Sequence, residues 1–128
     1  MFDLRECSVC CNITVGNLCS VCSDAHRDSH TIVVVESPHD LLTIEQVGDY
    51  NGLYHVLHGA ISPANGVGPN ELRIWELVMR VEIDSRVREV ILAMRSGQEG
   101  DATALYIQKN ALAGKRVKMT RFHFSDLG

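Results

Sequence analysis

The cysteines of the chain carry its clearest chemical signal. Cys7, Cys10, Cys19 and Cys22 form two Cys-x2-Cys pairs separated by eight residues, and apart from Cys11 the rest of the 128-residue sequence contains no cysteine. Two such pairs supply four thiolates, which is the ligand set of a tetrahedral structural zinc ion. A closed site of this kind stabilises a segment that is too short to build a hydrophobic core. We therefore predict a small C4 zinc knuckle near the N-terminus.

Some residues around this knuckle leave alternatives open. Cys11 directly follows the first pair, and we expect it to be a non-ligand, although a register that uses Cys11 in place of Cys10 stays open. His26 and His30 could offer imidazole ligands, but four thiolates already complete a tetrahedral site. A redox pair or inert free thiols are the alternative to zinc. No signal peptide precedes the cysteines, so we expect a reducing cytoplasm, where clustered thiols indicate metal binding rather than disulfides.

Three acidic residues form a second group with chemical potential. Glu36 follows a run of β-branched residues, and Glu99 and Asp101 follow another apolar run. In open parallel sheets, ligands bind beyond the carboxyl ends of the strands, where these residues are expected to meet. Three carboxylates there could hold Mg²⁺ for phosphoryl transfer, although magnesium is the less favoured cofactor. The alternatives are an N-cap role for Asp101 and a simple hydrogen-bonded strand end at Glu36.

Basic and imidazole side chains are the remaining candidates. Basic residues gather toward the C-terminus at Lys115, Arg116, Lys118 and Arg121. We expect a solvated face there, and DNA phosphate contact is the alternative. His55 and His58 lie in an apolar run and are interpreted as structural histidines.

Strands and helices that alternate along the chain must position the candidate cysteine, acidic, basic and histidine side chains. Runs of apolar and β-branched residues predict strands at 31–35, 52–58, 88–94 and 116–122. Helical spacing predicts helices at 41–47, 69–79 and 101–113, with glycine stops at Gly48 and Gly114. The helix that begins at Pro69 is expected to bury one face, made by Leu72, Trp75, Val78 and Met79. The prediction is an α/β fold with a four-stranded, largely parallel sheet flanked by helices. We divide the chain into a zinc knuckle with its connector at 1–30 and an α/β domain at 31–128.

The overall composition excludes several classes of protein. Hydrophobic residues make up 45% and charged residues 22% of the chain, which is typical of a globular domain. No apolar run approaches the roughly 20 residues that cross a bilayer. The formal net charge is −4, which argues against a free-standing electrostatic DNA clamp, because such binding depends on lysine and arginine.

Three motifs together resemble a known family. The double Cys-x2-Cys segment CSVCCNITVGNLCSVC is followed by GLYHVLHGAISPANGVGP and then by EGDATALYI. Their order and spacing resemble the bacterial recombination-mediator family RecR over nearly the whole chain from Cys7 to Arg121. One departure is the segment 94–97, Met-Arg-Ser-Gly, where the family usually has a Thr-Asn-Pro-Thr-like sequence.

This resemblance implies a C4 zinc finger followed by a Toprim domain, the α/β module shared with primases and topoisomerases. It implies that the zinc ligands are Cys7, Cys10, Cys19 and Cys22. It also implies that Glu36 is the Toprim glutamate, and that Glu99 and Asp101 stand where Toprim enzymes carry an Asp-x-Asp pair.

The resemblance further implies a cytoplasmic, non-enzymatic DNA-repair protein. Family members act with RecO and RecF to load RecA on gapped DNA, and they assemble into ring-like oligomers. They also carry a helix-hairpin-helix segment before the finger and an assembly region after the fourth strand, so we expect a truncated copy with weak or indirect DNA contact. The alternatives are a Mg²⁺-dependent Toprim phosphotransfer enzyme or nuclease that uses Glu36, Glu99 and Asp101, and a zinc-knuckle interaction module whose α/β part only packs.

Overall fold

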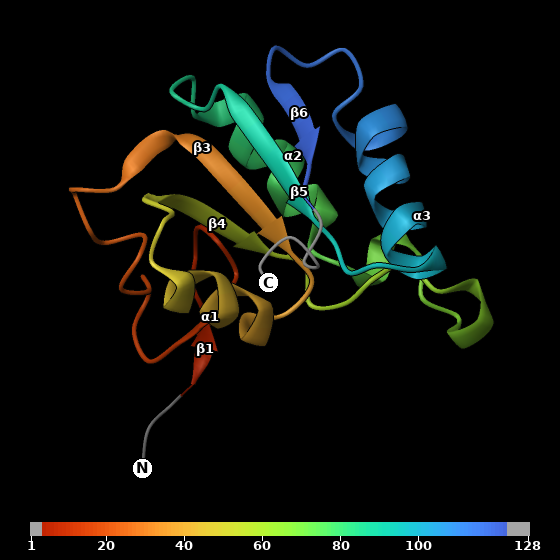
Figure 1. The fold of residues 1–128 in the computed structure, drawn as a ribbon, viewed down its shortest axis with the longest axis horizontal. Helices are drawn as coiled ribbons and strands as arrows, with labels where there is room; N and C mark the ends of the chain where they lie inside the picture. The colour runs from red at the N-terminus through yellow and green to blue at the C-terminus, as the bar shows by residue number, and fades with distance from the viewer. Residues whose placement is uncertain (1–3, 123–128) are drawn as a thin grey trace.

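The computed structural model describes residues 4–122, so the predicted limits at residues 1 and 128 lie outside the described residues. A short hairpin at the N-terminus precedes four longer strands that alternate with three helices (Figure 1). The strands are β1 (Arg5–Glu6), β2 (Ile13–Thr14), β3 (Asp28–Val35), β4 (Gly52–Val56), β5 (Glu89–Ala93) and β6 (Lys118–Arg121). The helices are α1 (Pro38–Val47), α2 (Ile74–Ile83) and α3 (Gln98–Tyr106).

The four longer strands form one parallel sheet in the order β4-β3-β5-β6. The central strand β3 pairs on both sides, with Val34 opposite His55 on β4 and opposite Leu92 on β5. From Ile32 to Val35, β3 is buried on both faces, as its run of β-branched residues predicts. The predicted four-stranded parallel sheet flanked by helices is confirmed.

Helix α1 follows β3 after a turn whose sequence specifies a helix start. Ser37 is extended and its hydroxyl accepts a hydrogen bond from the backbone N–H of Asp40, so it is the N-cap. Pro38 occupies the first helical position, where a missing N–H costs nothing. Gly48, at φ 84°, ends the helix in the left-handed conformation, as predicted.

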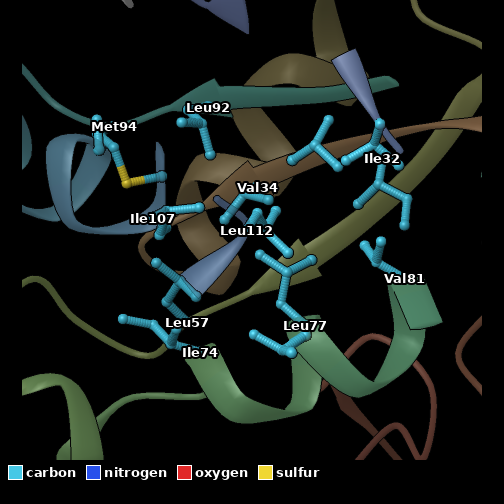
Figure 2. Packing of buried hydrophobic residues seen from close by; sticks show 14 of the residues in the cluster. Ile32, Val34, Leu57, Ile74, Leu77, Val81, Leu92, Met94, Ile107 and Leu112 are labelled. Carbon is cyan, nitrogen blue, oxygen red and sulfur yellow. The ribbon is translucent and has the colours of Figure 1, made fainter. Parts of the chain in front are cut away.

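One face of the sheet packs on α2, α3 and the segment that follows α3 (Figure 2). Residues of β3 and β5 point toward Leu77 and Val81 of α2, and toward Ile107 and Leu112. A π-helical turn, Ile107–Ala111, directs Leu112 into this core, where its backbone N–H donates to the carbonyl of Ile107. Removing one such buried leucine side chain costs about 2–5 kcal/mol.

The opposite face of the sheet packs on α1 and on the N-terminal segment, and α1 is drawn below β3 and β4 in Figure 1. Leu41 and Ile44 of α1 share this second core with Val33 and Val35 of β3, and with cysteine side chains. The sheet therefore separates two cores, one closed by helices and one closed partly by the cysteine-rich segment. Within the described residues, no helix has the length and apolar character needed to cross a bilayer.

Several element boundaries differ from the predictions, most clearly those of β3 and α3. Strand β3 begins at Asp28, inside the predicted polar connector, because Asp28 pairs with Gly52 at the start of β4. Helix α3 begins at Gln98 with Gly97 as its N-cap, so the predicted N-cap role of Asp101 is wrong. The carbonyl of Gly97 accepts the N–H of Asp101, which places Asp101 within the first turn. Beyond Tyr106, the predicted helix continues only as the π-helical turn.

The helix predicted from Pro69 is divided, and this changes which residues it buries. Pro69–Glu71 forms a single 3-10 turn, and Leu72 is extended at φ −112° and ψ 168°, so the α-helix begins only at Ile74. The buried face consists of Ile74, Leu77, Val78 and Val81. Trp75 follows Ile74 by about 100° around the helix and is 67% exposed, so its predicted burial is wrong.

The exposure of Trp75 gives a direct test of this helix register. Replacing the exposed Trp75 with serine should change the free energy of unfolding by less than about 0.5 kcal/mol. Leu77→Ala, on the buried face of the same helix, should cost about 2–5 kcal/mol. Urea unfolding followed by circular dichroism compares the two variants. A large loss in Trp75→Ser together with a small loss in Leu77→Ala would refute the register.

Candidate functional site

Four cysteine side chains converge at the N-terminal end of the molecule. The Sγ atoms of Cys7, Cys10, Cys19 and Cys22 all lie within 4.8 Å of one another, and those of Cys10 and Cys19 are 3.5 Å apart. A tetrahedral zinc site with Zn–S bonds of about 2.3 Å places its sulfurs roughly 3.8 Å apart. The geometry of the four thiols therefore fits a zinc ion held by all four.

Local backbone structure brings these thiols together. The paired strands β1 and β2 place Cys7 and Cys10 on a tight turn, in which the N–H of Cys11 donates to the carbonyl of Cys7. The backbone N–H of Cys19 donates to Cys7 Sγ, and that of Cys22 donates to Cys19 Sγ, both at 3.4 Å. Hydrogen bonds of this kind to ligand atoms orient them and stabilise the thiolate form.

The ionisation of the thiols depends on these contacts and on a cation. Burial opposes ionisation of Cys7, but backbone N–H groups of Cys10, Cys19 and Val9 outweigh it and lower the pKa of Cys7 to about 7. The pKa of Cys10 is raised, first by its hydrogen bond with Cys22 and then by burial. Four thiolates at this spacing repel one another, so a divalent cation is the group that allows all four to ionise.

The neighbouring candidates lie outside the cluster. Cys11 has a left-handed backbone at φ 69°, and burial is the main cause that raises the pKa of its thiol to about 12. The four clustered sulfur atoms include that of Cys10 and not that of Cys11, so the geometry favours Cys10 over Cys11 as the ligand. His26 and His30 are exposed and face Asp24 and Asp28 respectively, so they contribute no ligand to the four thiols.

The cysteine-rich segment is joined to the sheet by specific contacts. The carbonyl of Cys10 accepts the N–H of Val56 on β4 at 2.8 Å, and the carbonyl of Cys11 accepts His58 Nε2 at 2.6 Å. Arg73 makes a bidentate pair with Glu6, with N–O distances of 2.9 and 2.8 Å, and these hydrogen bonds lower the pKa of Glu6. The segment and the sheet therefore pack as one unit.

The three predicted acidic residues have three different partners. Glu36 Oε2 accepts the backbone N–H of Arg95 at 2.8 Å. Glu99 accepts a hydrogen bond from the hydroxyl of Ser62, and Asp101 pairs with Arg121 at 3.1 Å. Burial raises the pKa of Glu36, and the charges of Asp40 and Glu99 raise it further.

The acidic residues are near neighbours but not a ligand set. Among the described residues, the four thiols are the one group in which three or more potential metal ligands converge. Glu36 and Glu99 are close enough to interact electrostatically, whereas Asp101 is directed to Arg121 on β6. The carboxylates of Glu36, Glu99 and Asp101 therefore do not fit one magnesium ion in the arrangement observed.

Asp40 is a buried acidic residue that the sequence interpretation missed. It lies in the first turn of α1 with its side chain fully buried, and its Oδ1 accepts a hydrogen bond from Arg95 Nη2 at 2.5 Å. The signal for it was present in the sequence, because the helix start at Ser37 and Pro38 places Asp40 one helical turn after Glu36. The acidic edge, defined here as Glu36, Asp40 and Glu99, lies beyond the carboxyl end of β3.

The predicted basic residues are engaged mostly within the chain. Arg116 donates to the carbonyls of Val81 and Asp84 at 2.7 Å, and also to that of Val87, so it caps the end of α2. Lys115 pairs with Glu82, and Arg121 pairs with Asp101. Lys118 is exposed on β6. The structure therefore places this set on β6 and in the segment that leads to it, with Lys115 and Arg121 paired to carboxylates and Arg116 bound to backbone carbonyls.

Both predicted histidines are held by backbone carbonyls. His55 Nε2 lies 2.8 Å from the carbonyl oxygen of Arg73, and His58 contacts Cys11 as described above. His55 is fully buried, and its Nδ1 has no partner among the described residues. Burial lowers the pKa of His55 to about 4, so the ring is neutral near pH 7.

Two family models match this chain. The model described as the Toprim domain matches residues 30–123, and the one described as the four-cysteine zinc finger domain of RecR matches residues 4–24. The first match covers the parallel sheet with its helices, and the second covers the four clustered thiols. Fold and site together define a Toprim-domain protein with a four-cysteine zinc finger, and the finger carries a structural zinc.

Curated relatives cover both parts. The Recombination protein RecR of Lactobacillus johnsonii is 51% identical over 119 residues, which is 93% of this chain and 59% of the relative. The proteins of the same name from Lactobacillus helveticus and Lactococcus lactis subsp. cremoris MG1363 are 47% and 45% identical over the same shares. This chain belongs to the RecR family, and it spans about three-fifths of the length of these relatives.

Adjacent cysteines provide a matched test of the zinc site. Cys10→Ala should remove a ligand, abolish stoichiometric zinc binding and lower the melting temperature markedly, because metal binding contributes directly to folding. Cys11→Ala should retain one zinc per chain. Native mass spectrometry and thermal unfolding measure both effects. Equal zinc content in the two variants would contradict the assignment.

Burial of His55 predicts a specific dependence of stability on pH. Its pKa is about 4 in the folded chain against an ordinary value of 6.5 in the unfolded chain, so the folded form binds fewer protons between these values. The stability that neutral His55 contributes is complete above pH 6.5 and is lost as the pH falls toward 4. Between about pH 7.5 and pH 5, the free energy of unfolding should fall by roughly 2 kcal/mol more in the natural chain than in His55→Gln. Urea unfolding measures both, and equal losses would contradict this role.

Proposed function

We propose that this chain is a non-enzymatic scaffold in DNA recombination and repair, acting with RecO and RecF to promote RecA loading on gapped DNA. The observation that carries the proposal is the match to RecR recombination proteins across both the zinc finger and the sheet. Since zinc-binding thiols must stay reduced, we place this function in the reducing cytoplasm.

The role of a scaffold is supported by the way in which the finger joins the sheet. Cys10, Val56, Arg73 and Glu6 connect the two parts through hydrogen bonds and a bidentate ion pair. A platform built in this way presents its surface residues in fixed positions, which favours recognition of a partner with little loss of conformational entropy. We propose that the acidic edge is the partner-contacting part of this platform.

Charge supports the choice of partner. Glu36 is partly buried, and its negative charge lies beside those of Asp40 and Glu99. Clustered carboxylates complement basic groups, and such complementarity governs specificity and association rate. DNA contact is proposed to be weak or indirect in this chain, because Lys115, Arg116 and Arg121 bind groups within it.

The phosphotransfer alternative requires an arrangement other than the one observed. Glu36, Glu99 and Asp101 would have to leave Arg95, Ser62 and Arg121, respectively, to meet at one ion. We therefore propose that the acidic residues serve recognition rather than catalysis.

The test is the affinity of Glu36 variants for the cognate RecO. Glu36→Ala should leave the circular dichroism spectrum and melting transition nearly unchanged, but weaken RecO binding about tenfold, as expected for the loss of an interfacial charge. Glu82→Ala, which removes a carboxylate from the end of α2, is the control and should bind RecO normally. Isothermal titration calorimetry measures both affinities.

Two results would overturn the proposal. The first is a Glu36→Ala variant that binds RecO with unchanged affinity. The second is nicking of labelled DNA by the purified chain in the presence of Mg²⁺ or Mn²⁺ that disappears in Glu36→Gln, since this would establish the phosphotransfer alternative.

A further inference from the structure

One arginine of this chain binds two members of the acidic edge. The backbone N–H of Arg95 donates to Glu36 Oε2 at 2.8 Å, and Arg95 Nη2 donates to Asp40 Oδ1 at 2.5 Å. Arg95 follows β5, whereas Glu36 follows β3 and Asp40 lies in the first turn of α1. Two carboxylates and one arginine therefore meet where three elements come together.

The two ends of the Arg95–Asp40 pair differ in their access to solvent. The side chain of Asp40 is 0% exposed, whereas that of Arg95 is 58% exposed. The guanidinium thus lies between a buried carboxylate and water. The half-exposed guanidinium supplies the cationic partner of the buried carboxylate while it keeps its contact with water.

Asp40 has unused capacity to bind a donor. Its Oδ2 is buried and accepts no hydrogen bond from the described residues, so the contact with Arg95 uses one carboxylate oxygen. A carboxylate with two accessible oxygens can bind a guanidinium through two parallel hydrogen bonds, which is the stronger arrangement. The contact with Arg95 therefore leaves one oxygen of the buried carboxylate without a hydrogen-bond donor among the described residues.

The backbone of Arg95 is fixed even though its side chain is half exposed. A Cβ added to Gly100 would lie 1.8 Å from the carbonyl oxygen of Arg95, so only glycine allows this turn to close. Gly97, at φ 122°, provides the second special conformation in the same turn. The Arg95 guanidinium can consequently leave Asp40 by side-chain rotation while the hydrogen bond from its backbone to Glu36 stays in place.

We propose that Glu36 and Asp40 form an arginine-binding pocket, and that Arg95 occupies it in the isolated chain until an arginine of a basic protein partner displaces its side chain. The inference rests on the proposed function, in which the acidic edge contacts a partner. Guanidinium suits the pocket better than ammonium, because it is more weakly hydrated and offers paired donors to a buried carboxylate. Arg95 is then an internal competitor that sets the affinity of the pocket.

The size of the effect follows from the strength of the internal pair. An ion pair with one exposed member contributes up to about 1 kcal/mol, so an occupied pocket should bind an external arginine roughly fivefold more weakly than a vacant one. The same factor is the expected gain when Arg95 is removed.

The experiment is a ¹H–¹⁵N NMR titration of the full chain with N-acetyl-arginine amide. In Arg95→Ala, the arginine compound should change the chemical shifts of backbone amides within residues 36–41. The affinity fitted to these changes should be roughly fivefold higher than in the natural chain. Arg95→Gln, which retains a hydrogen-bond donor without the charge, is a second variant in case the alanine variant folds poorly. Adding Asp40→Asn to either variant should abolish the gain.

Two controls define the specificity. Arg86→Ala removes an arginine that is 66% exposed and paired with Asp84 at 2.8 Å, and it should leave binding unchanged. N-acetyl-lysine amide should bind more weakly than the arginine compound. The proposal is overturned if Arg95→Ala and the natural chain bind alike, if the lysine compound binds as well, or if MgCl₂ alone saturates the same amide shifts more tightly.

Failure of this inference can be separated from failure of the proposed function. If Glu36→Ala weakens RecO binding but Arg95→Ala does not strengthen binding of the arginine compound, the acidic edge contacts its partner and Arg95 is no competitor. If Glu36→Ala leaves RecO binding unchanged while Arg95→Ala opens the pocket to arginine, the pocket is real and the proposed partner is wrong.

Discussion

The packing of four sulfur atoms against a parallel sheet is the constraint on which the rest of this molecule depends. Cys7, Cys10 and Cys19 belong to the same core as Val35 and Tyr54, so the metal centre closes one face of the sheet. The other face is closed by α2, α3 and connecting segments that carry Leu57, Leu72 and Leu112. Zinc therefore does more than hold a short finger together, because its ligands are also apolar packing groups for the strands that carry the acidic edge.

Local sequence patterns predicted the parts of the structure that local interactions determine. The two Cys-x2-Cys pairs and the β-branched run at 31–35 were sufficient to predict the thiol cluster and a strand buried on both faces. The exposed position of Trp75 could not be predicted, because it depends on the extended conformation of Leu72. This conformation lets the N–H of Arg73 donate to the carbonyl of Leu57, directly after β4. The helix start at Ser37 and Pro38 was enough to place Asp40 one turn after Glu36, but its pairing with Arg95, which lies far along the chain, could not be predicted from that pattern.

The arginines show why a run of charge in the sequence is a weak guide to function. Arg116 stabilises the end of a helix through backbone carbonyls, Arg73 joins the finger to the sheet, and Arg95 neutralises a buried carboxylate. Each contact links segments that are distant in the sequence, so no pattern of neighbouring residues could have revealed it. In a chain with a net charge of −4, these internal pairs leave few cations for an outside polyanion.

The hydrogen bond from Val56 to the carbonyl of Cys10 has a consequence for how the protein is made. The cysteines leave the ribosome well before β4 does, since synthesis runs from the N-terminus at about 5–20 residues per second. During this interval the nascent finger has no sheet to pack against. Metal uptake is what can gather its four thiols at that stage, so zinc binding is able to precede the docking of the finger onto β4.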